Sequence, residues 1–298
     1  LKETIGRLET LLEVQPEVVV CDLHPKYNST VVAEELGLPV LRVQHHYAHI
    51  LSCMAENDCE EKVIGVSFDG TGYGTDGTIW GGELLVADCQ GFTRLGSIEP
   101  FVQVGGDISA KEGWRIAVSL IWKNMGNLEK TLDTVRKLGL CTDQEAKVLV
   151  TMAQRKINAV TSTSAGRLFD GVSAILGRAS TFEGEASTAL EFAAEAWRKQ
   201  REMQKKNPEE NLKIRMSEKE DIPESTGISE ASEDERKFIL NTGEIVAYLV
   251  RARLAGEDPG KLAYGFHRAL ADKILAACEE AERQTGIRKV ALSGGVFQ

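Results

Sequence analysis

Short apolar runs alternate with helical stretches at the start of the chain. Residues 18–22, 38–43 and 63–68 are rich in valine, isoleucine and leucine, as strands buried on both faces are. Residues 30–36 and 44–56 lie between these runs and carry helical signals. This order of strand, helix, strand, helix and strand predicts an α/β fold, with a parallel or mixed sheet and helices on its faces.

Three of the five histidines fall within five residues, at His45, His46 and His49. His45 and His49 are four residues apart, so on a helix their rings lie on one face, one turn apart. This spacing allows two imidazoles to bind one metal ion. Histidines on a helix are often ordinary surface residues, but the cluster favours a metal site at His45 and His49.

The strand at 63–68 leads directly into a glycine-rich stretch that carries Asp69, Gly70, Thr71, Gly72 and Gly74. Glycines placed straight after a strand allow backbone N–H groups to approach a phosphate closely. An ordinary hairpin is the alternative, because Asp-Gly pairs are common hairpin turn residues. Because this stretch has two such pairs with extra acids and hydroxyls, we expect a hairpin that binds phosphate and metal, followed by a strand at 78–86.

A second candidate ligand-binding segment begins at residue 161, where a run of hydroxyl residues leads into a helix. Gly166, in the first turn of this helix, permits close approach of a ligand. Asp170 follows four residues later and lies on the same face. An acid in this place can accept hydrogen bonds from the two hydroxyls of a ribose, as in dinucleotide-binding folds. The hydroxyl residues alone are equally well explained as helix caps.

Weaker signals follow in the last third of the chain. Glu183 precedes a glycine and a long helix, and no simple structural role accounts for it. His267 lies in an apolar helical stretch and is expected to be a core residue. The strand at 288–293 ends in Gly294 and Gly295, a turn that suits a nucleotide passing over the backbone.

Composition argues against several functional classes. The net charge of −10 at pH 7 disfavours a nucleic-acid-binding surface. No apolar run approaches the ~18 residues that a membrane span requires. The six cysteines are scattered and form no C-x-x-C pair, which fits the reduced thiols of a cytoplasmic protein. The acidic residues 207–235 are expected to form a solvated connection with one edge strand at 212–216.

Taken in order, these motifs resemble those of the HypF carbamoyltransferases, which mature [NiFe] hydrogenases. The resemblance extends over nearly the whole chain and rests on six stretches: CDLHP at 21–25, HHYAH at 45–49, DGTGYG at 69–74, WGGE at 80–83, GRLFD at 166–170 and SGGVFQ at 293–298. Tyr47 stands where this family often has histidine, which leaves His45 and His49 in place.

The resemblance implies an actin-like ATPase (ASKHA) fold of two lobes, which we expect at residues 1–160 and 161–298. It implies that a carbamoyl adenylate, made from carbamoyl phosphate and ATP by upstream domains, binds in the cleft. The carbamoyl group would then pass to the C-terminal cysteine thiol of the partner HypE, on the way to the cyanide ligands of the hydrogenase iron. Because the acceptor sulfur belongs to the partner, no cysteine of this chain needs to be a nucleophile.

The resemblance also implies roles for individual residues. His45 and His49 would hold a divalent metal ion (iron, zinc or magnesium), and Asp69 with its glycines would face the phosphate. A Lewis acid that touches the oxygens of the carbamoyl–phosphate anhydride stabilises the charge that develops as a thiolate attacks. The nucleotide would lie against Gly166, Asp170, Glu183, Gly294 and Gly295.

The ends of the chain predict a piece of a longer protein, because it opens inside a helical pattern and stops directly after a strand. Such a truncation predicts weak binding of metal and nucleotide. Two other functions stay open. One is a tRNA threonylcarbamoyl transferase, which the net charge disfavours. The other is a nucleotide-binding interaction module without catalysis, in which the histidine pair would have no chemical role.

Overall fold

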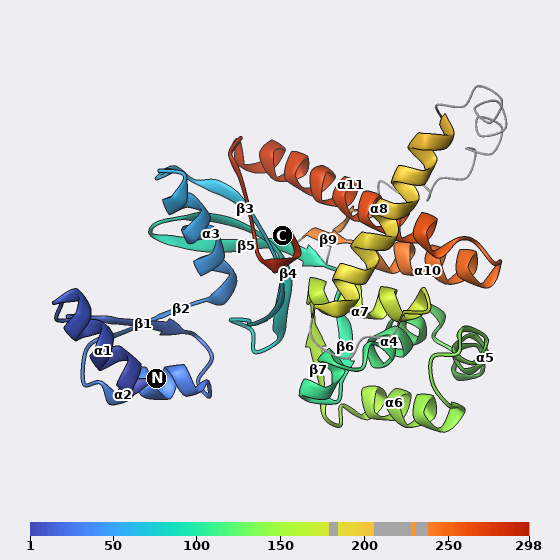
Figure 1. Cartoon of the computed structure of the whole chain (residues 1–298), viewed down its shortest axis with the longest axis horizontal. Helices are drawn as coiled ribbons and strands as arrows, with labels where there is room; N and C mark the ends of the chain where they lie inside the picture. The colour runs from blue at the N-terminus through green and yellow to red at the C-terminus, as the bar shows by residue number, and fades with distance from the viewer. Residues whose placement is uncertain (179–183, 206–227, 231–237, 298) are drawn as a thin grey trace.

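The computed structural model describes residues 1–178, 184–205, 228–230 and 238–297 (Figure 1). The N-terminal part is a small unit whose two strands pair in parallel, in register from Val19 with Val40 to Asp22 with Val43. Its elements are α1 (Lys2–Leu12), β1 (Val19–Asp22), α2 (Asn28–Glu35) and β2 (Val40–Val43). It lies at the left of Figure 1, and the chain leaves it through α3 (His45–Glu56).

The central element is a mixed sheet, which has eight strands within the described residues. Its main path runs β10-β3-β4-β5-β9-β8, with β3 parallel to β10 and antiparallel to β4. The short strand β7 pairs with both β4 and β6. The strands are β3 (Val63–Tyr73), β4 (Ile79–Asp88), β5 (Gly91–Ile98), β6 (Phe101–Val104), β7 (Ala159–Ser162), β8 (Ile228–Glu230), β9 (Phe238–Leu240) and β10 (Val290–Ser293).

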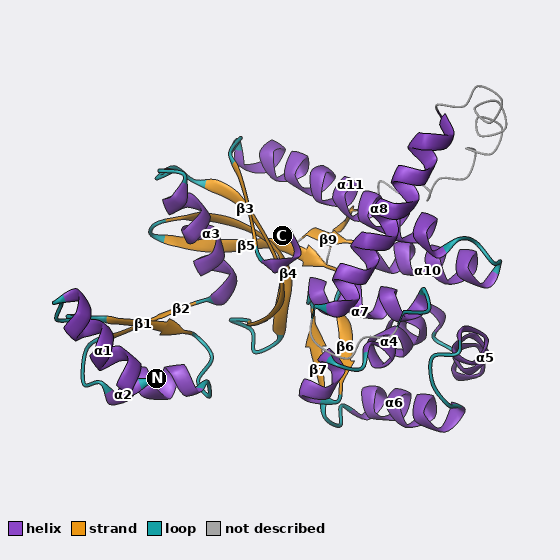
Figure 2. Ribbon diagram, viewed as in Figure 1, coloured by secondary structure: helices purple, strands orange, loops and turns teal. Residues whose placement is uncertain are grey.

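Helices flank this sheet and build most of the core (Figure 2). The helix α4 packs against both α7 and β6, and α8 packs along α11. Their bounds are α4 (Gly113–Met125), α5 (Leu128–Leu138), α6 (Asp143–Arg155), α7 (Ala165–Ile175), α8 (Glu185–Lys205), α10 (Thr242–Leu254) and α11 (Pro259–Thr285). Two short 3-10 helices, η1 (Gly106–Ala110) and η2 (Gly295–Phe297), complete the set.

Successive residues of β3 face two different cores. Ile64, Val66 and Phe68 are buried in the large core that the helices α4 and α7 help to form. Gly65 faces α3, because a Cβ on this residue would lie 2.7 Å from the Ile50 side chain. Since side chains alternate along a strand, the odd-numbered positions of β3 point toward the histidine helix.

The glycine-rich stretch after residue 68 forms the predicted hairpin, but the strand extends further than the predicted end at residue 68. β3 continues to Tyr73, and the hairpin turn to β4 lies at residues 74–78. The pairing register shifts between Phe68 and Gly72, which marks a β-bulge at residues 69–71. The glycines allow α3 to pack closely on the sheet, since a Cβ on Gly72 would overlap the His46 ring.

The predicted α/β fold with a mixed sheet and flanking helices is confirmed. The division into lobes at residues 160 and 161 stays a prediction. The predicted edge strand at 212–216 lies outside the described residues. A search of the described helices for one long and apolar enough to span a membrane finds none.

Candidate metal centre and adjoining pocket

The first turn of α3 presents the predicted histidine pair. Gln44 caps this helix, because its side-chain oxygen accepts a hydrogen bond from the backbone N–H of Tyr47. The helix therefore begins at His45, and the rings of His45 and His49 lie one turn apart with centroids separated by 4.9 Å. Both side chains are partly exposed, at 30% and 33%. The sequence prediction that these two rings lie together is confirmed.

Asp69 joins the two histidines from the sheet. As the next odd-numbered position of β3, its side chain points toward α3. Its Oδ2 lies 3.0 Å from Nε2 of His45 and 3.5 Å from Nε2 of His49. The three donor atoms lie within 4.8 Å of one another. Two imidazoles and one carboxylate are a donor set used for zinc and for non-haem iron, so these residues fit a divalent transition metal.

A second carboxylate orients His45 from the opposite edge of its ring. Asp22, the last residue of β1, places Oδ2 3.0 Å from Nδ1 of His45. Its other oxygen accepts a hydrogen bond from the backbone N–H of His24. Metal-binding histidines commonly donate their other N–H to a carboxylate in this way. Asp22 belongs to the recognised CDLHP stretch, but sequence reasoning assigned it no role.

The two carboxylates change the protonation of the group. The hydrogen bond with Asp69 raises the pKa of His45 most, burial opposes it, and the smaller effect of the hydrogen bond with Asp22 again raises it. The hydrogen bonds from His45 and His49 hold the pKa of Asp69 well below its usual range. Without metal, the structure therefore favours a protonated His45 that donates to both acids, and a metal ion would replace its Nε2 proton.

His46, the third histidine of the cluster, is a core residue. It is fully buried, and its Nδ1 lies 3.2 Å from the amide nitrogen of Gln44. Because that amide nitrogen is a donor, Nδ1 is the acceptor and Nε2 carries the proton. Burial lowers the pKa of His46 to about 3, so the ring is neutral.

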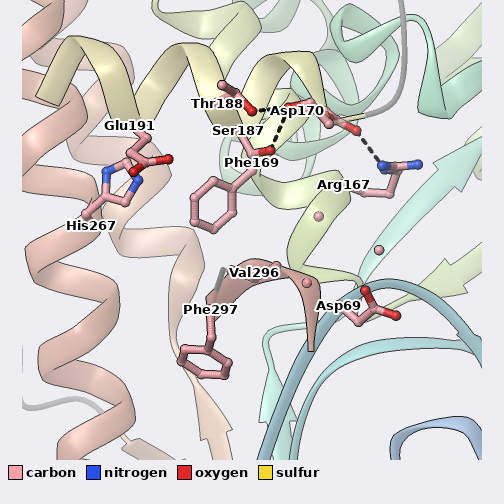
Figure 3. Close-up of a pocket in the computed structure, with 14 residues that line it drawn as sticks. Asp69, Arg167, Phe169, Asp170, Ser187, Thr188, Glu191, His267, Val296 and Phe297 are labelled. Carbon is pink, nitrogen blue, oxygen red and sulfur yellow. Dashed lines mark hydrogen bonds and ion pairs between the residues drawn. The ribbon is translucent and has the colours of Figure 1, made fainter. Parts of the chain in front are cut away.

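A pocket of about 630 Å³ adjoins the metal group. Figure 3 shows Asp69 at one end and the side chains of Glu191 and His267 at the other. Glycine backbone forms part of the wall nearest Asp69, and residues of α7, α8, α11 and η2 contribute to the rest. The predicted site residues that line it are Asp69, Gly70, Gly166, Asp170 and Gly295.

The remaining predicted residues lie beside this pocket or beyond it. Thr71 is exposed and bonds the carbonyl of Gly70, while Gly74 packs against the indole of Trp80. Gly294 packs against β3, because a Cβ there would lie 2.1 Å from the carbonyl oxygen of Phe68. Its φ of +108° also requires glycine. Glu183 lies outside the described residues.

Asp170 forms part of the pocket wall and is almost completely buried. Its Oδ2 pairs with Nε of Arg167 at 2.7 Å, and both side chains are 4% exposed. In Figure 3 the hydroxyls of Ser187 and Thr188 also point toward this carboxylate. The predicted ribose contact of Asp170 stays a prediction.

His267 lines the far end of the pocket instead of lying only in the core, as its apolar sequence context had suggested. Its Nδ1 lies 2.8 Å from the carbonyl oxygen of Ala263, so Nδ1–H donates to that carbonyl. The ring packs against Phe169 and Phe266. Helical periodicity shows which face of α11 is turned inward. It does not show whether a residue on that face lies in the core or lines a pocket.

Two family profiles match this chain in succession. Residues 1–56 match the HypF Kae1-like domain, and residues 65–298 match the carbamoyltransferase Kae1-like domain, second subdomain. Kae1-like domains have the actin-like ATPase fold, so the fold type predicted from the sequence is also confirmed.

Relatives and solved structures agree with these profiles. The chain is 32% identical to a probable carbamoyltransferase HypF of Methanocaldococcus jannaschii, with 99% of the chain and 36% of the relative aligned. It is 35% identical to carbamoyltransferase HypF of Synechocystis sp., with all of the chain and 37% of the relative aligned. A HypF homologue of Cupriavidus necator is 33% identical, with all of the chain and 71% of the relative aligned.

The crystal structure of full-length HypF in its phosphate- and nucleotide-bound form superposes with a TM-score of 0.81 at 32% identity, covering 99% of this chain and 42% of that one. HypF of T. kodakarensis gives a TM-score of 0.77 at 30% identity, covering 99% and 36%. The sequence motifs, both profiles and these structures agree along nearly the entire length, and the chain belongs to the HypF carbamoyltransferase family.

Proposed function

We propose that this chain is the carbamoyl-transferring region of a longer HypF protein. A carbamoyl adenylate, made from carbamoyl phosphate and ATP by other domains of that protein, binds in the pocket beside Asp69. The carbamoyl group then passes to the C-terminal cysteine thiol of a HypE-like partner, as a step toward the cyanide ligands of the [NiFe] hydrogenase iron. The reaction takes place in the cytoplasm, where thiols stay reduced.

The observation that carries this proposal is the double position of Asp69. Its carboxylate belongs to the group with His45 and His49, and it also lines the pocket. A molecule bound in that pocket therefore lies beside one of the three residues that would hold the metal. The volume of about 630 Å³ lies within the range of ordinary small-molecule sites, ~300–1,000 Å³.

His45, His49 and Asp69 would hold the divalent metal ion in the proposed reaction. When bound, that ion supplies Lewis-acid stabilisation of the negative charge that develops on the phosphate and carbonyl oxygens. Asp22 keeps the Nδ1 proton on His45 and so directs the Nε2 lone pair to the metal position. Iron, zinc and magnesium are the candidate ions, and the two imidazoles favour the first two.

The pocket wall binds and orients the nucleotide. Gly70, Gly166 and Gly295 expose backbone at its surface, which allows phosphate oxygens and the ribose to approach closely. In the transfer step the thiolate attacks the carbamoyl carbon, a C–S bond forms, and the C–O bond to the phosphate breaks. AMP leaves with the bonding electrons, and the thiol proton passes to solvent.

The decisive experiment follows the carbamoyl group itself. The protein is supplied with carbamoyl adenylate labelled in the carbamoyl carbon, a divalent metal ion, a HypE-like partner and tRNA, with the His49→Ala variant in parallel. Label on the partner's C-terminal cysteine, lost in the variant, supports the proposal. Nucleotide binding without transfer, in this chain and in the full-length protein, indicates a binding module, and label on tRNA instead indicates the RNA-modifying alternative.

A further inference from the structure

We infer that Glu83, Arg94 and Thr163, named here the Glu83 network, are positioning residues that hold Asp69 in the metal group. None of the three belongs to that group or lines the pocket. The inference rests on the proposed metal site and adds to it the part of the sheet that fixes its carboxylate ligand.

The Glu83 network is a buried and fully connected set of charged and polar groups. Glu83, on β4, has no exposed surface, yet its carboxylate accepts hydrogen bonds from two backbone N–H groups, those of Gly81 and Gly82. Arg94 of β5 donates Nε–H to its second oxygen at 2.7 Å. The hydroxyl of Thr163, just before α7, donates to its first oxygen at 2.5 Å.

Further contacts fix the arginine. Arg94 lies over the Trp80 ring at 4.1 Å and makes an ion pair with Asp76 at 3.2 Å. Its third nitrogen lies 3.4 Å from the hydroxyl of Thr163. A guanidinium that is stacked and paired at both edges is fixed in orientation, so it also fixes the carboxylate of Glu83.

The Glu83 network stabilises β4 at the position where its pairing with β3 is interrupted. The ladder between β3 and β4 is interrupted by the bulge, because register is kept at Phe68 with Gly82 and at Gly72 with Trp80 but not between them. Gly81 therefore faces the bulge without a paired residue, and its N–H turns to Glu83. The buried carboxylate thus satisfies the N–H groups of Gly81 and Gly82, the β4 residues that lie opposite and beside the bulge.

Both segments held by the network touch the backbone of the bulge. A Cβ on Gly81 would lie 2.7 Å from the carbonyl oxygen of Asp69 and 2.7 Å from Cα of Ser164, so the three backbones pack directly against one another. Ser164, next to Thr163, also donates its hydroxyl to the carbonyl of Gly70. Any shift of Gly81 or Thr163 therefore displaces the peptide that carries the Asp69 side chain.

The stability of the fold does not by itself require the buried ion pair of Glu83 and Arg94. Well-packed apolar residues often replace a buried ion pair without loss of stability, whereas removing one partner leaves an unpaired charge and is strongly destabilising. Replacing both Glu83 and Arg94 therefore tests their effect on the position of Asp69 separately from their effect on folding. The variant that carries Glu83→Leu and Arg94→Met should fold but leave the bulge unsupported.

The test compares zinc affinity, measured by competition with a chromogenic chelator, in the unmodified protein, this double variant and Asp69→Asn. We expect the double variant to lose affinity tenfold or more and to resemble Asp69→Asn, including in the visible spectrum of the cobalt-substituted protein. The matched control carries Glu99→Gln and Lys123→Met, which remove a partly buried ion pair at the start of α10. Its metal affinity should be unchanged.

Thermal unfolding of the metal-free proteins establishes that each variant is folded. If the folded double variant binds zinc as the unmodified protein does, the inference is wrong. If the double variant does not fold, the Glu83→Gln variant is used in its place, because it keeps the size of the side chain. Normal zinc binding by the folded Glu83→Gln variant would then show that the inference is wrong.

A protein that binds no metal in any form would overturn the metal site of the proposed function instead. In that case amide hydrogen exchange tests whether the Glu83 network holds the bulge in place. Exchange at residues 69–72 should be faster in the folded variant than in the control, and equal exchange would overturn the inference.

Discussion

Asp22 and His45 are joined by a 3.0 Å contact between a carboxylate oxygen and Nδ1, on the edge of the ring that faces away from His49 and Asp69. The contact exists because β1 and β2 pair in parallel and end together, which brings residue 22 beside the start of α3. The N-terminal unit thus reaches the candidate metal centre through the side chain of Asp22.

Asp22→Asn should weaken metal binding at pH 8 by about 10- to 100-fold, the range found when carboxylates behind metal-binding histidines are removed. The amide keeps the size of the side chain but removes the charge that favours the Nδ1–H tautomer. Zinc affinity by chelator competition measures the effect. Asp133→Asn, which changes an exposed carboxylate on α5, is the control, and equal affinities in the two variants would contradict the role of Asp22.

Metal binding should also depend on pH through His45. Hydrogen bonds with Asp69 and Asp22 raise its pKa above 6.5, and zinc must displace the Nε2 proton. Below the raised pKa each unit of pH should therefore weaken binding about tenfold. This loss should begin at a higher pH in the unmodified protein than in Asp22→Asn, which lacks part of the stabilisation of the charged ring. Zinc titrations between pH 6 and 8.5 test this order, and coincident profiles would exclude it.

His46 should make the protein sensitive to acid. Burial lowers its pKa from 6.5 to about 3, so the unfolded chain takes up a proton more readily than the folded one. The stability that neutral His46 contributes is therefore present above pH 6.5 and is lost as the pH falls toward 3.

His46→Gln removes this titration. Between pH 7.5 and 4.5 the unmodified protein should lose about 2–3 kcal/mol more of its free energy of unfolding than the variant loses. Urea denaturation of both metal-free proteins at the two pH values measures the difference. An equal loss in both would mean that the folded protein lets this ring become protonated.

Some of this site can be predicted from sequence because its signals are local. The spacing of His45 and His49 depends only on helical periodicity, which the structure follows. The position of Asp69 is set by the two-residue alternation of β3, and that signal was available in the sequence. It was missed because the strand was predicted to end at Phe68, so the alternation was not continued to Asp69.

Other parts depend on contacts between distant segments. Asp22 reaches His45 through strand pairing, and Glu83 meets Thr163 across 80 residues of sequence. The WGGE stretch was identified as a family motif, but only the packing shows that its acid is buried and holds glycine backbone. Periodicity likewise cannot show that the glycines of residues 70–72 serve close packing and a bulge rather than a loop.

Gly166 offers a test of the close approach between α7 and the bulge. A Cβ on this residue would lie 2.8 Å from Cα of Gly70, and backbone on both sides leaves no flexible group to move aside. Alanine favours a helix over glycine by about 1 kcal/mol, but the steric overlap should outweigh this gain and give a net destabilisation of roughly 1–3 kcal/mol.

Because Gly166 and Gly70 both line the pocket, Gly166→Ala should also weaken AMP binding, by about tenfold if ~1.4 kcal/mol of contact is lost. Isothermal titration with AMP and urea denaturation measure the two effects. Gly91→Ala is the matched control, since a Cβ there meets nothing within 4 Å and the residue lies away from the pocket. Normal AMP binding by a destabilised Gly166→Ala would show that this contact serves the fold alone, whereas unchanged stability would mean that α7 moves freely away from β3.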